Sequence, residues 1–152
     1  MTPGKVRAAT LVTKAAQVES MLQAVRALPL SSLDEFESDP RNPAAGESYL
    51  RRALEALFDL SRHILAKAFA EAPSEYKSVA AALGRVAVLD DSQVALMLDI
   101  AGYRNRMVHF YDEISSQELY EILTGQMEDV AVLLEALLGW AQMNPQRVDG
   151  AL

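Results

Sequence analysis

Cysteine is absent from this sequence of 152 residues. Disulfide bonds and thiolate metal sites are therefore excluded, and we expect a protein of the reducing cytoplasm. Histidine is scarce, with two residues, and no motif of paired metal ligands occurs. The sequence therefore gives no ground for expecting a metal site or a cofactor.

Long apolar runs are absent as well. The longest, Val130 to Trp140, contains Glu135 and is too short to cross a bilayer. The charged N-terminal residues precede no apolar stretch, so we expect neither a signal peptide nor a membrane partner. Clusters of β-branched residues are also missing, and the abundance of alanine and leucine favours helices over sheets.

Charge is distributed unevenly along the chain. The net charge is -7, and the segment from Asp112 onward, with eight acidic residues and one basic residue, accounts for all of it. This balance argues against broad electrostatic binding of nucleic acid but leaves room for a local basic cleft. We interpret the C-terminal acids as a solvated helix face.

Apolar periodicity and turn residues divide the chain into helices. The pattern predicts five, at residues 3–28, 44–70, 74–88, 92–109 and 115–143, with Gly84 as a weak point in the third. Capping boxes at Ser32 and Ser115 predict a short helical turn after residue 32 and the start of the last helix. Asp90 or Asp91 caps the fourth helix, and residues 39–43 should form an extended turn.

These elements predict an all-α fold: an antiparallel four-helix bundle with an additional short helix, in a single domain spanning residues 1–152. The last predicted helix is apolar over a wide arc. We expect part of that arc to bury against a second copy in a homodimer. The alternative is a broad core within one chain.

Residues 103–111, Tyr-Arg-Asn-Arg-Met-Val-His-Phe-Tyr, concentrate reactive groups at the end of the fourth predicted helix. Arg104 carries a planar fork of donors suited to phosphate oxygens, and His109 can transfer protons near neutral pH. Asn105 supplies an amide and Tyr111 a hydroxyl. At helical spacing, Asn105 and His109 share a face, next to a stripe with Arg104 and Tyr111, so the four can line one groove.

Such a set supports the transesterification of RNA. A base removes the proton of a ribose 2′-hydroxyl, the oxygen attacks the neighbouring phosphate, and a cation stabilises the charge that develops there. No metal is needed for this chemistry.

Each residue also has a structural interpretation. Arg104 can pair with an acid such as Asp99, His109 can serve the helix dipole, and Tyr111 can pack as a half-buried aromatic. For one residue alone we favour that interpretation, and for the set at this spacing we favour function. The second histidine, His63, we interpret as structural.

Three arginines of the second predicted helix, Arg51, Arg52 and Arg62, allow two interpretations. They extend a basic strip for RNA, or they are exposed partners of Glu47, Glu55 and Asp59 at helical spacing. We favour the second. For Tyr120 and Trp140 we favour core packing over a role at an interface.

The pattern Arg104-x4-His109-x-Tyr111, with Asn105 and Val108 in place, resembles the signature of the HepT-like HEPN ribonucleases. Residues 47–64 resemble the family's second helix, and residues 76–83 resemble the segment before its motif helix. The resemblance implies a metal-independent endoribonuclease toxin of a toxin–antitoxin pair, acting on RNA.

The resemblance also implies partners and roles for residues. The antitoxin would be a minimal nucleotidyltransferase, and a homodimer would place two motifs around one composite active site. Arg104 and His109 would be catalytic, Asn105 and Tyr111 would contact RNA, and Tyr111 would be adenylylated by the antitoxin. The alternative function is a non-catalytic HEPN module that binds a nucleotide or scaffolds a nucleotidyltransferase.

Overall fold

A computed structural model describes residues 3–109 and 114–152, with the side chains of Val108 and His109 left out. Within these residues the chain forms seven α-helices, one 3-10 turn and two very short strands. The helices are α1 (Ala8–Arg26), α2 (Leu33–Glu37), α3 (Arg41–Phe69), α4 (Tyr76–Arg85), α5 (Asp91–His109), α6 (Ser116–Gly125) and α7 (Met127–Met143).

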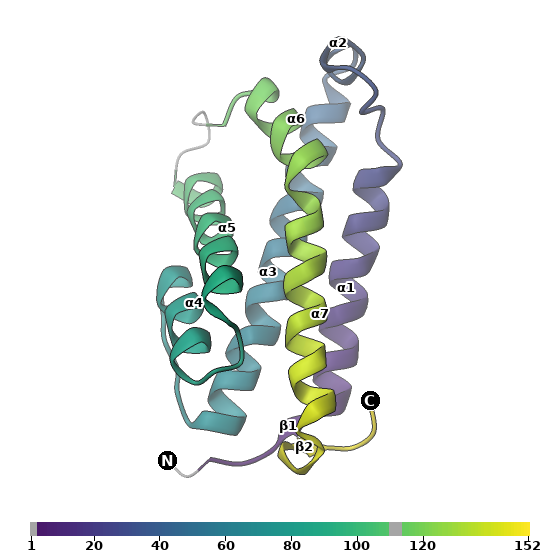
Figure 1. Cartoon of the computed structure of the whole chain (residues 1–152). Coiled ribbons are helices and arrows are strands. Elements are labelled where there is room, and N and C mark those ends of the chain that lie inside the picture. The colour runs from purple at the N-terminus through teal and green to yellow at the C-terminus, as the bar shows by residue number, and fades with distance from the viewer. Residues whose placement is uncertain (1–2, 110–113) are drawn as a thin grey trace.

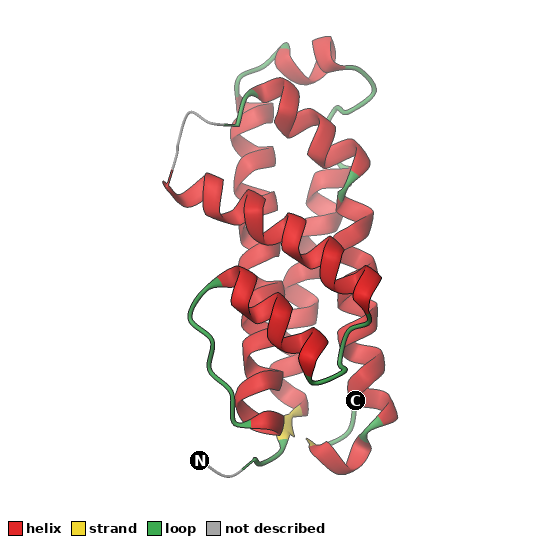
Figure 2. Cartoon of the chain, turned by 60° about the vertical axis from the view of Figure 1, so that its left-hand side comes forward, coloured by secondary structure: helices red, strands yellow, loops and turns green. Residues whose placement is uncertain are grey.

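Four long helices form the bundle, and α1 and α5 run in the opposite direction to α3 and α7 (Figure 1). Helix α1 packs along α3, α7 lies beside both, and α5 slants across α3 on the other flank (Figure 2). The shorter α4 lies beside α5, while α2 and α6 lie at the end of the bundle opposite the chain termini (Figure 1). The predicted all-α bundle is therefore confirmed.

Helix α3 is the central element because its apolar stripe faces several neighbours at once. The whole predicted stripe is buried, including the one polar member, Ser61, whose hydroxyl donates to the Leu57 carbonyl oxygen at 2.9 Å. The other predicted members are Leu50, Ala53, Leu54, Leu57, Leu60, Ile64, Leu65 and Ala68, all of them buried. This arrangement lets Asp59 of α3 pair with Lys14 of α1, and Glu55 of α3 pair with Arg104 of α5.

Two predicted boundaries were wrong. The first helix begins at Ala8 because Val6–Arg7 (β1) pairs in parallel with Val148–Asp149 (β2), which follows the 3-10 turn Pro145–Arg147. Residues 41–43 do not form an extended turn but open α3. Pro43 is tolerated there because the first-turn amides of a helix have no partner within it.

The last predicted helix is also interrupted. Helix α6 ends at Gly125, Gln126 leaves helical geometry at φ -123° and ψ -5°, and α7 follows. Glycine near this point weakens the helix by about 1 kcal/mol relative to alanine, and the break lets α6 turn across the end of the bundle to pack on α3. Most of the apolar arc of α7 is buried within the chain, so the homodimer stays a prediction.

The predicted capping residues act as expected at three helix starts. The Ser32 hydroxyl accepts a hydrogen bond from the backbone amide of Glu35, and the Ser115 hydroxyl accepts one from the backbone amide of Glu118, each at 3.1 Å. Asp90 caps α5 by accepting from the Gln93 amide at 2.9 Å. These caps fix where the motif helix begins and where the chain becomes helical again after residue 113.

Candidate functional site

Arg104 is a buried cation on the inner side of α5. The residue is 8% exposed, and its Nη2 donates to Glu55 Oε1 of α3 at 2.6 Å. Its guanidinium also lies against the ring of Tyr76, the first residue of α4, at 5.2 Å from the ring centroid. Three helices therefore hold one guanidinium.

Two nitrogens of Arg104 have no acceptor. Nε and Nη1 are buried, and neither makes a hydrogen bond to any group that the structure describes. Buried donors are nearly always satisfied in native proteins, because an unpaired one costs about 1–3 kcal/mol. An arginine in this condition is a candidate for binding an anion.

The Arg104 side chain borders a hollow of about 660 Å³ between α3, α5 and the start of α6. Among the described residues, its charged lining is Glu47, Arg51, Glu55 and Arg104. Arg51 pairs with Glu47 at 3.3 Å and approaches Glu55 at 3.9 Å. The remaining lining is Pro43, Ala44, Met107, Ile114, Ser116 and Leu119. The hollow thus has two guanidinium groups joined by one carboxylate.

Asn105 lies in a second, smaller hollow of about 420 Å³, together with residues 74–77. Tyr76 connects the two places, because its ring contacts Arg104 and it also lines the hollow of Asn105. Among the described residues, Arg104 and Asn105 therefore line different hollows, and a groove shared with His109 and Tyr111 stays a prediction. Adjacent positions on a helix diverge by about 100°, so the two side chains leave α5 in different directions.

The other two predicted site residues are His109 and Tyr111. His109 is the last residue of α5, and its side chain is not among those described. Tyr111 lies outside the described residues. Their assigned roles stay predictions.

An ion pair joins the helices on either side of this segment. Arg106 of α5 donates to both oxygens of Glu118 in the first turn of α6, at 2.6 and 2.8 Å. The hydrogen bonds and charge of Arg106 hold the pKa of the Glu118 carboxyl below its ordinary value. The last turn of α5 is therefore tied to α6.

The predicted structural role of His63 agrees with its contacts. Its Nε2 accepts a hydrogen bond from the Arg7 amide at 3.0 Å, at the end of the bundle that holds the two strands. Partial burial, and then the charges of Lys67 and Arg7, lower the pKa of His63 below its usual value. The imidazole is thus kept neutral as an acceptor.

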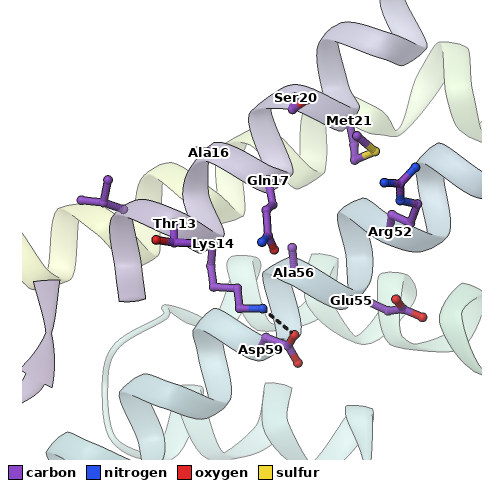
Figure 3. A pocket seen from close by; sticks show the side chains of 11 residues that line it. Thr13, Lys14, Ala16, Gln17, Ser20, Met21, Arg52, Glu55, Ala56 and Asp59 are labelled. Atoms are coloured by element: carbon purple, nitrogen blue, oxygen red, sulfur yellow. Dashed lines mark hydrogen bonds and ion pairs between the residues drawn. The ribbon is translucent and has the colours of Figure 1, made fainter. Parts of the chain in front are cut away.

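The predicted pairing of the three α3 arginines is correct only for Arg51. Arg62 donates to the Ser74 carbonyl oxygen at 3.1 Å and lies over the Tyr76 ring at 4.7 Å. Arg52 borders a groove of about 820 Å³ between α1 and α3, where Lys14 pairs with Asp59 at 3.1 Å (Figure 3). Glu55 lines this groove as well as the hollow of Arg104.

No group of three or more histidine, cysteine or acidic side chains in the described part of the chain is arranged to hold a metal ion. Among the helices of residues 3–109 and 114–152, none has the length and hydropathy required to cross a membrane.

The sequence model of the family described as "Ribonuclease HepT-like" matches residues 18–137, which is most of the chain. The chain belongs to the HepT-like ribonuclease family. No curated protein sequence gives a significant match.

Solved structures share the fold of this HepT-like chain. One is a tri-AMPylated HEPN toxin of Shewanella oneidensis in complex with MNT antitoxin, at a TM-score of 0.76 and 17% identity. The match covers 86% of this chain and 97% of that one. A toxin–antitoxin structure with AMP-PNP matches at a TM-score of 0.73 and 16% identity. That match covers 84% of this chain and 97% of the other. A cytosolic protein of unknown function, YutE of Bacillus subtilis, matches at a TM-score of 0.75 and 13% identity. That match covers 90% of this chain and 91% of the other.

Sequence reasoning missed two residues that contact Arg104. It offered Asp99 as the acid for Arg104, whereas the partner is Glu55, separated from it by 49 positions. It also gave Tyr76 no part, although two arginines contact its ring. No local pattern marks either residue, because both contacts depend on how α3, α4 and α5 pack.

Proposed function

We propose that this HepT-like chain is a metal-independent endoribonuclease toxin that cleaves RNA by 2′-hydroxyl transesterification. The observation that carries the proposal is Arg104, a buried guanidinium with two unpaired nitrogens beside a hollow, within the family's motif. A phosphodiester supplies the anionic oxygens that such donors require.

In the proposed reaction, the His109 imidazole takes the proton of a ribose 2′-hydroxyl. The 2′-oxygen attacks the adjacent phosphorus, and the bond from phosphorus to the 5′-oxygen breaks. The imidazole returns the proton to the leaving 5′-oxygen, so the products end in a 2′,3′-cyclic phosphate and a 5′-hydroxyl. Arg104 stabilises the charge on the phosphoryl oxygens, and Asn105 and Tyr111 contact the RNA.

The partners follow from the same family. A minimal nucleotidyltransferase antitoxin inhibits the toxin by adenylylating Tyr111, which adds a bulky anion to the residues proposed to contact RNA. Two copies of the chain form a homodimer in which both motifs face one composite site. The solved neighbours named as toxin–antitoxin structures support the antitoxin partner, at the level of the fold.

The deciding experiment compares the two histidines of the chain. His109→Ala should abolish RNA cleavage in vitro and growth arrest on expression, whereas His63→Gln should retain both, because His63 serves the packing of residue 7. Cleavage should persist in EDTA and leave cyclic phosphate ends. Equal activity of wild type and His109→Ala would reject the mechanism, and loss of activity in EDTA would reject metal independence.

Regulation is tested separately, by co-expression with a nucleotidyltransferase encoded beside the chain. We expect the intact mass to increase by one or more AMP groups, with one on Tyr111, and Tyr111→Phe to lose that modification. An inhibited complex whose Tyr111 is unmodified would show that binding alone blocks the toxin. Light scattering of the free chain should give twice the monomer mass.

One observation favours a second function, a non-catalytic module that binds a nucleotide or scaffolds a nucleotidyltransferase. The hollow beside Arg104 contains two carboxylates, Glu47 and Glu55, and these repel an extended polyanion more than a single nucleotide. This function predicts that wild type and His109→Ala both bind AMP and that neither cleaves RNA.

A further inference from the structure

One carboxylate, that of Glu55, accepts a hydrogen bond from the Arg104 guanidinium. We propose that Glu55 is a positioning residue that holds Arg104 for its contact with the scissile phosphate. The inference rests on the ribonuclease function proposed above and adds a residue outside the 103–111 motif.

The geometry of the contact is specific. Among the described residues, Glu55 is the acid that pairs with Arg104, at 2.6 Å, and only Nη2 is engaged. Nε and Nη1 stay without acceptors. The carboxylate therefore holds one end of the guanidinium and leaves its other two nitrogens unsatisfied.

Glu55 makes no other ionic contact as short as the one with Arg104 among the described residues. Its second cation, Arg51, is at 3.9 Å and lies closer to Glu47. In the groove between α1 and α3, the Glu55 carboxylate points away from the Lys14–Asp59 pair (Figure 3). The shortest ionic contact of Glu55 is thus the one across to α5.

The two partners differ in exposure, and this difference separates positioning from folding. The Arg104 side chain is 9% exposed and that of Glu55 is 39% exposed. Without the carboxylate, the buried guanidinium has no counter-charge and gains by turning toward water. The half-exposed α3 position itself tolerates an amide, so we expect the fold to persist.

Kinetics with Glu55→Gln test the proposal. We expect kcat for RNA to fall about 10- to 100-fold, because displacing a catalytic group by about 1 Å costs up to about 100-fold in rate. KM should change less than about threefold, since the rest of the RNA contacts are intact. A purely structural role would instead lower the midpoint of thermal unfolding and leave kcat per folded molecule unchanged.

Glu71→Gln is the matched control. It removes the carboxylate of another glutamate–arginine pair, with Arg85 at 2.5 Å, at a place remote from the hollow. It should cleave RNA as the wild type does. Equal kcat in the two variants would overturn the proposal, as would faster cleavage or tighter RNA binding by Glu55→Gln, which would make Glu55 a competitor of the phosphate.

A second measurement is independent of RNA cleavage. The Nε–H proton of Arg104, identified by its loss in Arg104→Lys, should exchange slowly with solvent in the wild type and in Glu71→Gln. It should exchange rapidly in Glu55→Gln. Identical exchange in all three proteins would overturn the proposal. A wild type that cleaves no RNA would reject the ribonuclease, and the exchange rate would then decide the role of Glu55 alone.

Discussion

Arg106 and Glu118 form a pair of parallel hydrogen bonds, at 2.6 and 2.8 Å, between the motif helix α5 and the first turn of α6. Both side chains are about one-third exposed. Glu118 sits three residues after the Ser115 cap, yet its carboxylate bonds to Arg106 of the preceding helix. The sequence predicted the cap but not this ion pair, which connects the last turn of α5 to α6.

Glu118→Gln should lower the free energy of unfolding by about 1 kcal/mol at pH 7, since a two-bond ion pair lies at the upper end of what partly exposed pairs contribute. The effect should depend on pH. Arg106 lowers the pKa of Glu118 in the folded state, so the stabilisation is complete above the ordinary value of 4.5 and disappears as pH falls through the folded value.

Urea denaturation at neutral and acid pH measures this effect. Glu121→Gln is the control, because Glu121 is exposed on the same helix, and it should change stability by less than about 0.5 kcal/mol. A difference between wild type and Glu118→Gln that is equally large in strong acid would show that the carboxylate charge is not the cause.

His63 differs from Glu118 because it is a base. Partial burial and the charges of Lys67 and Arg7 lower its pKa on folding. Above its ordinary value of 6.5 the imidazole is neutral in both states and pH has no effect through it. As pH falls below that value, the unfolded chain binds the proton more readily, so the folded state loses stability.

We therefore expect the wild type to lose more stability than His63→Gln when pH is lowered from about 7.5 to about 5.5. Unfolding of both proteins in urea at the two pH values checks this. His109 is present in both proteins, so its titration cancels in the comparison. Parallel stability curves would mean that His63 has the same pKa in both states.

Gly84 illustrates why a weak point in a predicted helix can be required by packing. A Cβ added to Gly84 would lie 2.7 Å from Val94 Cγ2, where α4 approaches α5. Val94 is β-branched and adjusts poorly, so overpacking of about 1–3 kcal/mol outweighs the gain in helix propensity of about 1 kcal/mol. We predict that Gly84→Ala lowers the free energy of unfolding by about 1 kcal/mol.

Gly139→Ala is the matched variant. An added Cβ there meets nothing within 4 Å, so only the propensity gain applies and α7 should become more stable by up to about 1 kcal/mol. Thermal unfolding of the two variants should shift in opposite directions. Shifts of the same sign would remove the packing explanation for Gly84.

The parts of this fold that the sequence predicted depend on periodic apolar residues and on capping residues close by in the chain. The stripe from Leu50 to Ala68 predicted the buried face of α3, and the serine caps predicted where α2 and α6 begin. The failures involve distant partners. The pairing of Val6 with Val148 shortens α1, and no pattern within either segment announces it. The Glu55–Arg104 contact has the same origin.

Arg104→Lys separates the charge of the site from its shape. A lysine retains the positive charge and a contact with Glu55, so the fold should persist. It has no planar fork, however, and it lacks the Nε and Nη1 donors that are unpaired in the structure. If those donors bind the phosphoryl oxygens, RNA cleavage should fall about 100-fold, the usual effect of removing one donor to the transition-state charge.

Single-turnover cleavage by Arg104→Lys measures this effect, beside circular dichroism as a check of the fold. Arg62→Lys is the control, because Arg62 also lies over the Tyr76 ring but bonds to a backbone carbonyl away from the hollow. It should retain most of the activity. Near-complete activity of Arg104→Lys would show that a positive charge beside the hollow is sufficient and that its unpaired nitrogens take no part in cleavage.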